Sequence, residues 1–199
     1  MRKYHLLLFL LVFTICGCAA NENKNEIIEE SKKISLKSIP FENEEYSILR
    51  AAGANHSMIF SINLGRVNAN KIKYWIDHYE NGKLTGTIFN LESQISNESE
   101  HMDYKLYFSI SDSASNQERW TLALRQHGNV SSGSYDMKDI DFDSTGIQPI
   151  ADNSINLNKN ADLGMIIRNK GKNQFTSSDD VKATINENKD VYVIRCGFN

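Results

Sequence analysis

The sequence predicts a mainly β fold: an antiparallel β-sandwich or barrel-like domain with at most one or two short helices. Three observations favour it. Apolar residues recur with a period of two in several segments, an Asn-Gly pair marks a tight hairpin, and turn residues separate short strands at intervals of roughly 8–15 residues. The Cys…Trp…Cys spacing of immunoglobulin domains is absent, so we assign no such domain.

The alternation is clearest in three segments, whose apolar residues are Met58, Phe60, Ile62 and Leu64; Leu106, Phe108 and Ile110; and Trp120, Leu122 and Leu124. Largely polar residues lie between them, so each segment is predicted to be a half-buried strand with one face toward a core and one toward water. Residues 163–168 and 191–198 are predicted to be further strands.

Asn81-Gly82 is the strongest local turn signal. Both residues tolerate the positive φ that a two-residue type I′ hairpin turn requires. Counting back from this turn predicts the register, which pairs Glu80 with Lys83, Trp75 with Ile88 and Tyr74 with Phe89.

Polar segments predict the connections. Residues 112–117, 131–134 and 152–160 are expected to form loops or turns. Residues 178–186 are predicted to form one short helix, capped by Ser178 or Asp179.

The N-terminus has the organisation of a secretory signal. Arg2 and Lys3 precede ten residues, Leu6 to Ile15, of which only Thr14 is polar. This basic start, short apolar stretch and small-residue end are typical of a signal peptide, and the stretch is too short to span a membrane. Residues 1–17 are therefore expected to be removed.

The run Ile15-Cys16-Gly17-Cys18 resembles the lipobox of bacterial lipoproteins. The resemblance implies cleavage before Cys18 and attachment of a diacylglyceryl group to that cysteine. Two acyl chains anchor a protein stably, so the protein would be held on the extracytoplasmic face of the cell membrane. Cys16 departs from the Ala or Ser more usual at its position, and the alternative is an ordinary secretory signal that happens to contain Cys18. The resemblance ends at the lipobox.

After the signal peptide, the sequence predicts a flexible tether over residues 18–40 and a single β-rich domain over residues 41–199. The segment from Asn21 to Ser38 is polar and charged, and Pro40 closes it. Loss of residues 1–17 leaves 20 basic against 25 acidic residues, a net charge of −5. This acidic balance argues against a nucleic-acid partner and against electrostatic adhesion to anionic lipid. The Lys-, Asn- and Ile-rich composition with two Pro is typical of AT-rich genomes and indicates a Gram-positive bacterium.

The cysteine count excludes an intrachain disulfide in the mature protein. Of three cysteines, Cys16 is removed and Cys18 carries lipid, so Cys196 is left alone. It lies on the predicted apolar face of the last strand, where it is expected to be a small buried hydrophobe. The alternative is a reactive or intermolecular thiol.

A calcium site is the sharpest chemical hypothesis in the sequence. Asp139, Asp141 and Asp143 could supply oxygen ligands to Ca²⁺. The segment does not match an EF-hand loop, because Ser144 and Ile150 stand where Gly and Glu are required. The alternative is a strand or loop with three solvated aspartates.

No other motif indicates chemistry. The four histidines of the mature chain, His56, His78, His101 and His127, lack zinc-like spacing. There is no Gly-x-Ser-x-Gly elbow and no Gly-rich phosphate loop. An aromatic set, Tyr74, Trp75 and Tyr79, could form a binding face, although core packing is the favoured use.

These observations favour a membrane-anchored, non-catalytic module that binds a protein, a cell-wall polymer or a small ligand, since loops on rigid β scaffolds commonly carry recognition. No catalytic residue and no cofactor is assigned. The alternatives are an extracytoplasmic hydrolase with an unrecognised active site and a calcium-stabilised surface module.

Overall fold

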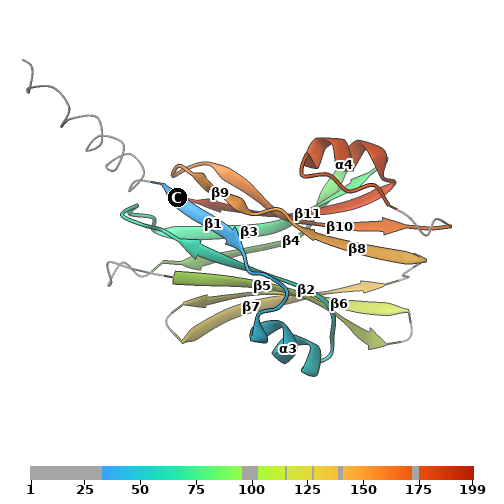
Figure 1. Cartoon of the computed structure of the whole chain (residues 1–199), viewed down its shortest axis with the longest axis horizontal. Helices are drawn as coiled ribbons and strands as arrows, with labels where there is room; N and C mark the ends of the chain where they lie inside the picture. Colours follow the sequence, from blue (N-terminus) through green and yellow to red (C-terminus); the bar gives the residue numbers. More distant parts are fainter. Residues whose placement is uncertain (1–32, 96–102, 115, 127, 139–140, 172–174) are drawn as a thin grey trace, which may run out of the picture. The chain divides into compact units, whose positions relative to one another are not determined.

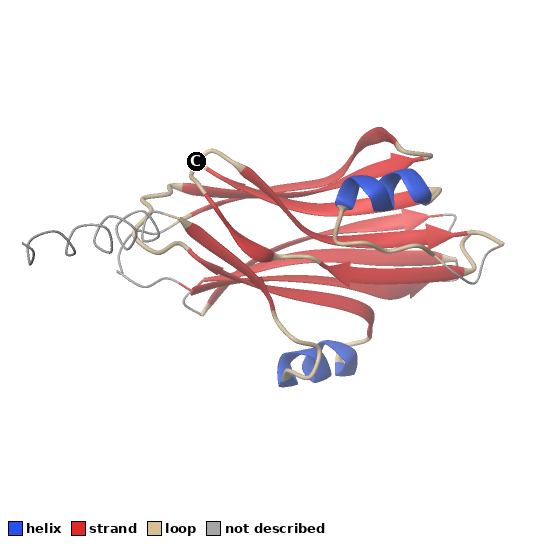
Figure 2. Cartoon of the chain, turned by 45° about the horizontal axis from the view of Figure 1, so that its top comes forward, coloured by secondary structure: helices blue, strands red, loops and turns tan. Residues whose placement is uncertain are grey.

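Two antiparallel sheets face each other and enclose the core, which confirms the predicted fold class (Figure 1). The computed structural model describes residues 33–95, 103–114, 116–126, 128–138, 141–171 and 175–199. Residues 33–199 form one compact unit. The two short helices of these described residues lie on opposite outer sides of the sandwich (Figure 2).

The first sheet has six strands. In spatial order these are β7 (Asn129–Lys138), β6 (Gln117–Gln126), β5 (Asp103–Ala114), β2 (Ala54–Asn63), β1 (Ile34–Ser38) and β9 (Asp152–Ile155). The second sheet has five strands: β4 (Lys83–Gln94), β3 (Lys71–Glu80), β11 (Asp190–Phe198), β10 (Asn160–Asn169) and β8 (Ser144–Pro149). Every described strand pair is antiparallel.

The alternating residues form the core as predicted. All ten apolar residues of the three alternating segments are buried between the sheets: nine lie in β2, β5 and β6, and Leu64 directly follows β2. From the opposite sheet, buried residues of β3, β10 and β11 close the same core: Ile72, Tyr74, Ile76, Leu163, Ile166, Tyr192, Ile194, Cys196 and Phe198. Burial of this apolar surface is the main stabilising contribution to the fold, and the one described cysteine, Cys196, forms no disulfide.

The helices cover the outer faces. In α3 (Glu44–Ala51), capped by Asn43, the buried Tyr46 hydroxyl accepts a hydrogen bond from Ile59 N and donates one to Ile39 O, both 3.0 Å long. In α4 (Val181–Glu187), Asp180 caps the N-terminus, two residues after Ser178 and one after Asp179. The predicted helix is therefore present, with its cap displaced along the chain.

The predicted boundary between tether and domain is wrong. Residues 34–38, placed in the tether by their polar surroundings, form β1 and pair with both β2 and β9. Ile34 and Leu36 are buried in the core, whereas Lys37 is exposed. The alternation of this strand was hidden by the charged residues that precede it, and the folded unit begins at Lys33.

The predicted hairpin turn is confirmed, but the register beyond it is wrong. Asn81 and Gly82 have φ of 48° and 79°, and Glu80 pairs with Lys83. Two register shifts then place Trp75 opposite Asn90 and Tyr74 opposite Leu91. The shifts insert Thr85 and Ile88 as extra residues in β4, and such bulges cannot be counted from a turn.

Two of the three predicted loops are largely strand, and the third is strand in part. Residues 131–134 lie inside β7. A Cβ on Gly133 would lie 2.8 Å from Leu91 Cδ1 and 3.1 Å from Phe89 Cζ, so the small residue permits close approach of the opposite sheet rather than a turn. Residues 112–114 end β5, residue 117 begins β6, and residues 152–155 form β9.

The sandwich has two distinct ends. We call the end of the sandwich where β1 begins the entry end; it also holds the last residues of β4, β6 and β11. In the first sheet, Ser35 of β1 pairs with Asn63, and Tyr104 pairs with Gln126 at the end of β6. In the second sheet, Lys71 pairs with Gln94 at the end of β4. The far end holds the last residues of β3 and β10 and the first residues of β6 and β11.

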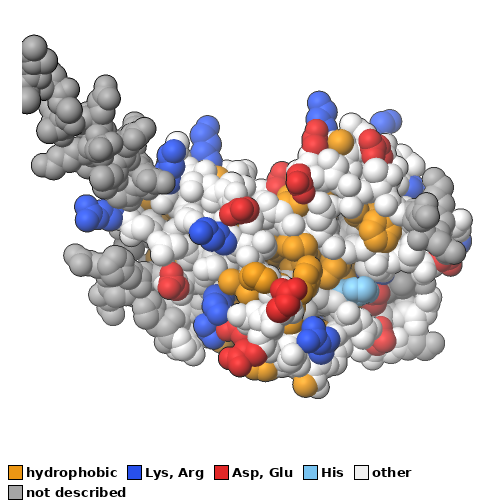
Figure 3. All heavy atoms as spheres, viewed as in Figure 1, with side chains coloured by type: hydrophobic (Ala, Val, Ile, Leu, Met, Phe, Trp, Pro, Cys, Tyr) orange, Lys and Arg blue, Asp and Glu red, His pale blue; other side chains and the backbone are white. Residues whose placement is uncertain are grey.

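On the face seen in Figure 3, side chains of both charge signs are interspersed around an apolar strip.

Candidate functional site

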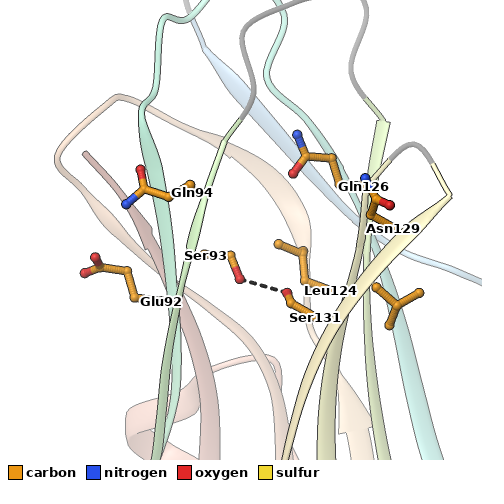
Figure 4. Close-up of a pocket in the computed structure, with 8 residues that line it drawn as sticks. Glu92, Ser93, Gln94, Leu124, Gln126, Asn129 and Ser131 are labelled. Carbon is orange, nitrogen blue, oxygen red and sulfur yellow. Dashed lines mark hydrogen bonds between the residues drawn. The ribbon is translucent and has the colours of Figure 1, made fainter.

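A groove lies at the entry end, where the edge strands β4 and β7 of the two sheets approach each other (Figure 4). Its volume is about 340 Å³. The residues that line it are mostly polar and uncharged: Ser93, Gln94, Gln126, Asn129 and Ser131, with Glu92, Leu124 and Val130.

A line of hydroxyl groups runs from the core into the groove. The Tyr74 hydroxyl, buried between the sheets, lies 3.4 Å from Ser93 Oγ, which lies 2.8 Å from Ser131 Oγ. Figure 4 shows the Ser93–Ser131 bond spanning the gap between the strands. The groove therefore contains groups that can both donate and accept hydrogen bonds.

Among the described residues that line the groove, Glu92 is the one with a formal charge. Glu92 is exposed, and its Oε1 lies 2.7 Å from Lys71 Nζ. Within the described lining there is no His, Cys, Lys or Arg. The arrangement suits an uncharged ligand rich in hydroxyl or amide groups.

The far end holds a buried ion pair that joins the two sheets. Arg168, a residue only 1% exposed, donates through its guanidinium to both carboxylate oxygens of Glu118; the bond to Oε1 is 3.0 Å long. Trp120 Nε1 donates to Glu118 Oε2 at 2.9 Å, and Arg168 lies over the rings of Trp120 and Phe142. Since the carboxylate is bound by three donors, we assign Glu118 and Arg168 to structural stabilisation.

Aromatic and histidine side chains continue this cluster. The Tyr192 ring packs edge-on against Trp120 and stacks on His78, with centroid distances of 4.9 and 4.3 Å. Burial, followed by the nearby Asp190 carboxylate, raises the pKa of Tyr192 far above its ordinary value. Burial and the Arg168 guanidinium lower the pKa of His56, so that this imidazole is neutral at neutral pH.

The two described aspartates of the predicted calcium site, Asp141 and Asp143, interact with other groups of the protein. The Asp141 carboxylate pairs with Lys170, and Asp143 accepts a hydrogen bond from Gly171 N. Phe142 between them contacts Arg168. Asp139 lies outside the described residues, so the calcium hypothesis stays a prediction.

Two histidines, His56 and His78, lie within the described residues. His78 belongs to a cluster that the spacing of the histidines along the sequence did not indicate. Nε2 of His78, an Oε of Glu80 and an Oδ of Asp190 lie within 4.8 Å of one another. His78 and Glu80 share one face of β3, but Asp190 comes from β11 more than a hundred residues later, so no local pattern could predict the set. His101, His127 and Cys18 lie outside the described residues.

The three aromatic residues of β3 do not form one binding face. Tyr74 is buried in the core, as the favoured interpretation expected. Trp75 Nε1 donates to Asp77 Oδ2, and the Tyr79 hydroxyl accepts from Arg195, both on the opposite face of the strand. Arg195 also donates to Asp162 and Asp77, so these side chains stabilise the outer surface of the sheet.

Cys196 lies in the core, and burial raises the pKa of its thiol to about 12. We therefore expect iodoacetamide at pH 8 to leave Cys196 unmodified in the native protein and to alkylate it in urea, because only the thiolate reacts. Mass spectrometry of the peptide that contains Cys196 measures this. Modification of the native protein at the rate seen in urea would contradict the buried assignment and support a reactive thiol.

Comparison with known proteins identifies the family through a match to the YgaN domain over residues 35–198. The chain belongs to the YgaN domain family. The match begins inside β1, in agreement with a folded unit that includes this strand. The searches of curated proteins and of solved structures find no match. Within the described residues, no helix is both long enough and apolar enough to cross a membrane.

Proposed function

We propose that this chain is a lipoprotein on the extracytoplasmic face of a Gram-positive cell membrane, whose β-sandwich is a non-catalytic binding module. Its ligand is an uncharged polymer rich in hydroxyl groups, the chemistry of cell-wall glycan. The observation that carries the proposal is the groove between β4 and β7, with its hydroxyl and amide lining.

The lining matches such a ligand chemically. Gln126 and Asn129 are direct partners across β6 and β7, so their two amides lie together at one end of the groove. Each amide both donates and accepts hydrogen bonds, as glycan hydroxyls do. Leu124 and Val130 add apolar surface beside these polar groups, a combination common in ligand sites.

The same lining disfavours glycan hydrolysis. Glycosidases generally place two carboxyl groups on either side of the scissile bond. Among the described lining residues Glu92 is the single carboxylate, and Lys71 binds it. The groove supports holding a glycan better than cleaving one.

The anchor would place the groove near the membrane. Attachment at Cys18 leaves residues 19–33 between the lipid and β1, a connection of at most about 55 Å when fully extended. Since β1 begins at the same end of the sandwich as the groove, the anchor would keep the groove on the membrane side of the domain.

Binding of wall glycan tests the proposal. We expect the variant Gln126→Ala/Asn129→Ala to bind purified, uncharged glycan fragments about tenfold more weakly or worse than wild type in calorimetry, because it loses several hydrogen bonds of about 0.5–1.5 kcal/mol each. The matched control is Thr121→Ala/Ser134→Ala, which removes a hydroxyl pair from the same two strands outside the groove. Equal weakening in both variants, or no binding by wild type, would reject the groove as the site. Shortened fragments would favour the hydrolase.

A further inference from the structure

The cluster of His78, Glu80 and Asp190 at the far end carries an inference independent of the glycan groove. Their ligand atoms all lie within 4.8 Å of one another. His78 Nε2 lies 3.0 Å from Asp190 Oδ1 and 3.9 Å from Glu80 Oε1. We propose that these three side chains form a binding site for a divalent metal ion of the Zn²⁺ type.

The tautomer of His78 decides which of its nitrogens has a lone pair, and Thr85 lies where it can favour one tautomer. Thr85 Oγ1 lies 3.0 Å from both the backbone carbonyl and Nδ1 of His78. When the hydroxyl donates its one proton to the carbonyl, Nδ1–H donates to the hydroxyl. In the neutral ring, Nε2 then carries no hydrogen.

A neutral ring in this tautomer directs its Nε2 lone pair at the oxygen of Asp190, 3.0 Å away. Two lone pairs at this distance repel each other, so in this tautomer the contact requires a positive charge between them, whereas in the other tautomer Nε2–H donates to Asp190. Either a second proton on His78 or a metal ion supplies it. In metal sites, a histidine ligand usually donates its other ring N–H to a partner, which is the role Thr85 fills here.

Strand pairing supplies a second reason for a cation. Glu80 and Asp190 are direct cross-strand partners on β3 and β11. Like charges at such positions destabilise a sheet. Within the described residues, His78 is the one basic side chain with a nitrogen within 4.0 Å of either carboxylate. A divalent ion would neutralise both carboxylates at once.

Geometry and surroundings suit zinc. Tetrahedral ligands at the usual bond lengths lie about 3.3 Å apart, and the distances of 3.0 and 3.9 Å from Nε2 bracket that value. The stacked Tyr192 ring, inclined by 5°, holds the imidazole in place. The Glu80 side chain is 53% exposed, so it can adjust and leave a path for the ion. Three protein ligands leave a fourth position for water.

Titration of the purified protein with ZnCl₂ alone tests the site. We expect one ion to bind and to raise the melting temperature, with affinity reduced at least tenfold in His78→Gln and in Asp190→Asn. Thr85→Val, which keeps all three ligands but frees the ring, should bind about 10–100-fold more weakly. The control His56→Gln should bind as wild type does.

Absence of binding at millimolar zinc, or affinity unchanged in His78→Gln, would overturn the proposal. If the variants fold poorly, nitrogen NMR of the wild-type His78 ring gives the answer without them. A resonance of Nε2 that moves to a metal-bound position on addition of zinc supports the site. A protonated Nε2 that zinc leaves unchanged overturns it.

Discussion

Replacement of Glu118 by Ala is expected to lower the free energy of unfolding by about 3–5 kcal/mol, because it leaves the Arg168 guanidinium buried without its counter-ion. Arg168 is almost fully inaccessible and donates to both Glu118 oxygens, and Trp120 Nε1 loses its acceptor as well. A loss of this size is a large part of the total stability of a typical domain. Urea denaturation of the variant measures it.

Two further variants separate this explanation from a general effect of lost charge pairs. Asp136→Ala removes a fully exposed pair with Arg119, and we expect the urea midpoint to stay near that of wild type. Glu118→Gln combined with Arg168→Met removes both buried charges and should recover much of the stability lost in Glu118→Ala. A double variant as unstable as the single variant would contradict the assignment of the loss to an unpaired buried charge.

Replacement of Leu36 by Ala is expected to lower the free energy of unfolding by about 2–5 kcal/mol, because it opens a cavity where β1 meets the core. Leu36 is fully buried and pairs with Ile62 on one side and Asn153 on the other. Chemical denaturation with a tryptophan fluorescence readout measures the change.

Lys37→Ala is the matched control, since it alters the neighbouring exposed residue in the same strand, and a change within about 0.5 kcal/mol is expected. If Leu36→Ala is equally neutral, residues 34–38 do not contribute to the core, and the predicted tether would extend to residue 40 after all.

The local sequence pattern was sufficient to predict the fold class but not to predict where each strand begins and ends. Apolar residues recur with a period of two in β2, β5 and β6 because each strand has one buried and one solvated face, so these strands can be recognised from the sequence. The strand at Ile34 and Leu36 has the same alternation, but it is short and depends on β2 and β9 for partners. The bulges at Thr85 and Ile88 depend on contacts across the sheet and leave no periodic signal.

The candidate sites depend still more on contacts that are distant in sequence. The groove brings Ser93 to Ser131, and the proposed metal site brings His78 to Asp190. Each of these residues is unremarkable in its own segment, and only strand order places them together. Asp139, Asp141 and Asp143 show the converse. Their close spacing in the sequence suggested a calcium site, but the two described ones, Asp141 and Asp143, have protein partners.

The lipid anchor is the premise of the proposed function, because it determines the compartment and therefore the ligands that the groove can meet. Mass spectrometry of the N-terminal peptide from the native protein tests it most directly. We predict a chain that begins at Cys18 and carries the mass of a diacylglyceryl group, and a Cys18→Ala variant that is left unprocessed or released from the membrane. A wild-type chain cleaved elsewhere without lipid, or a Cys18→Ala variant still processed and membrane-bound, would contradict the account.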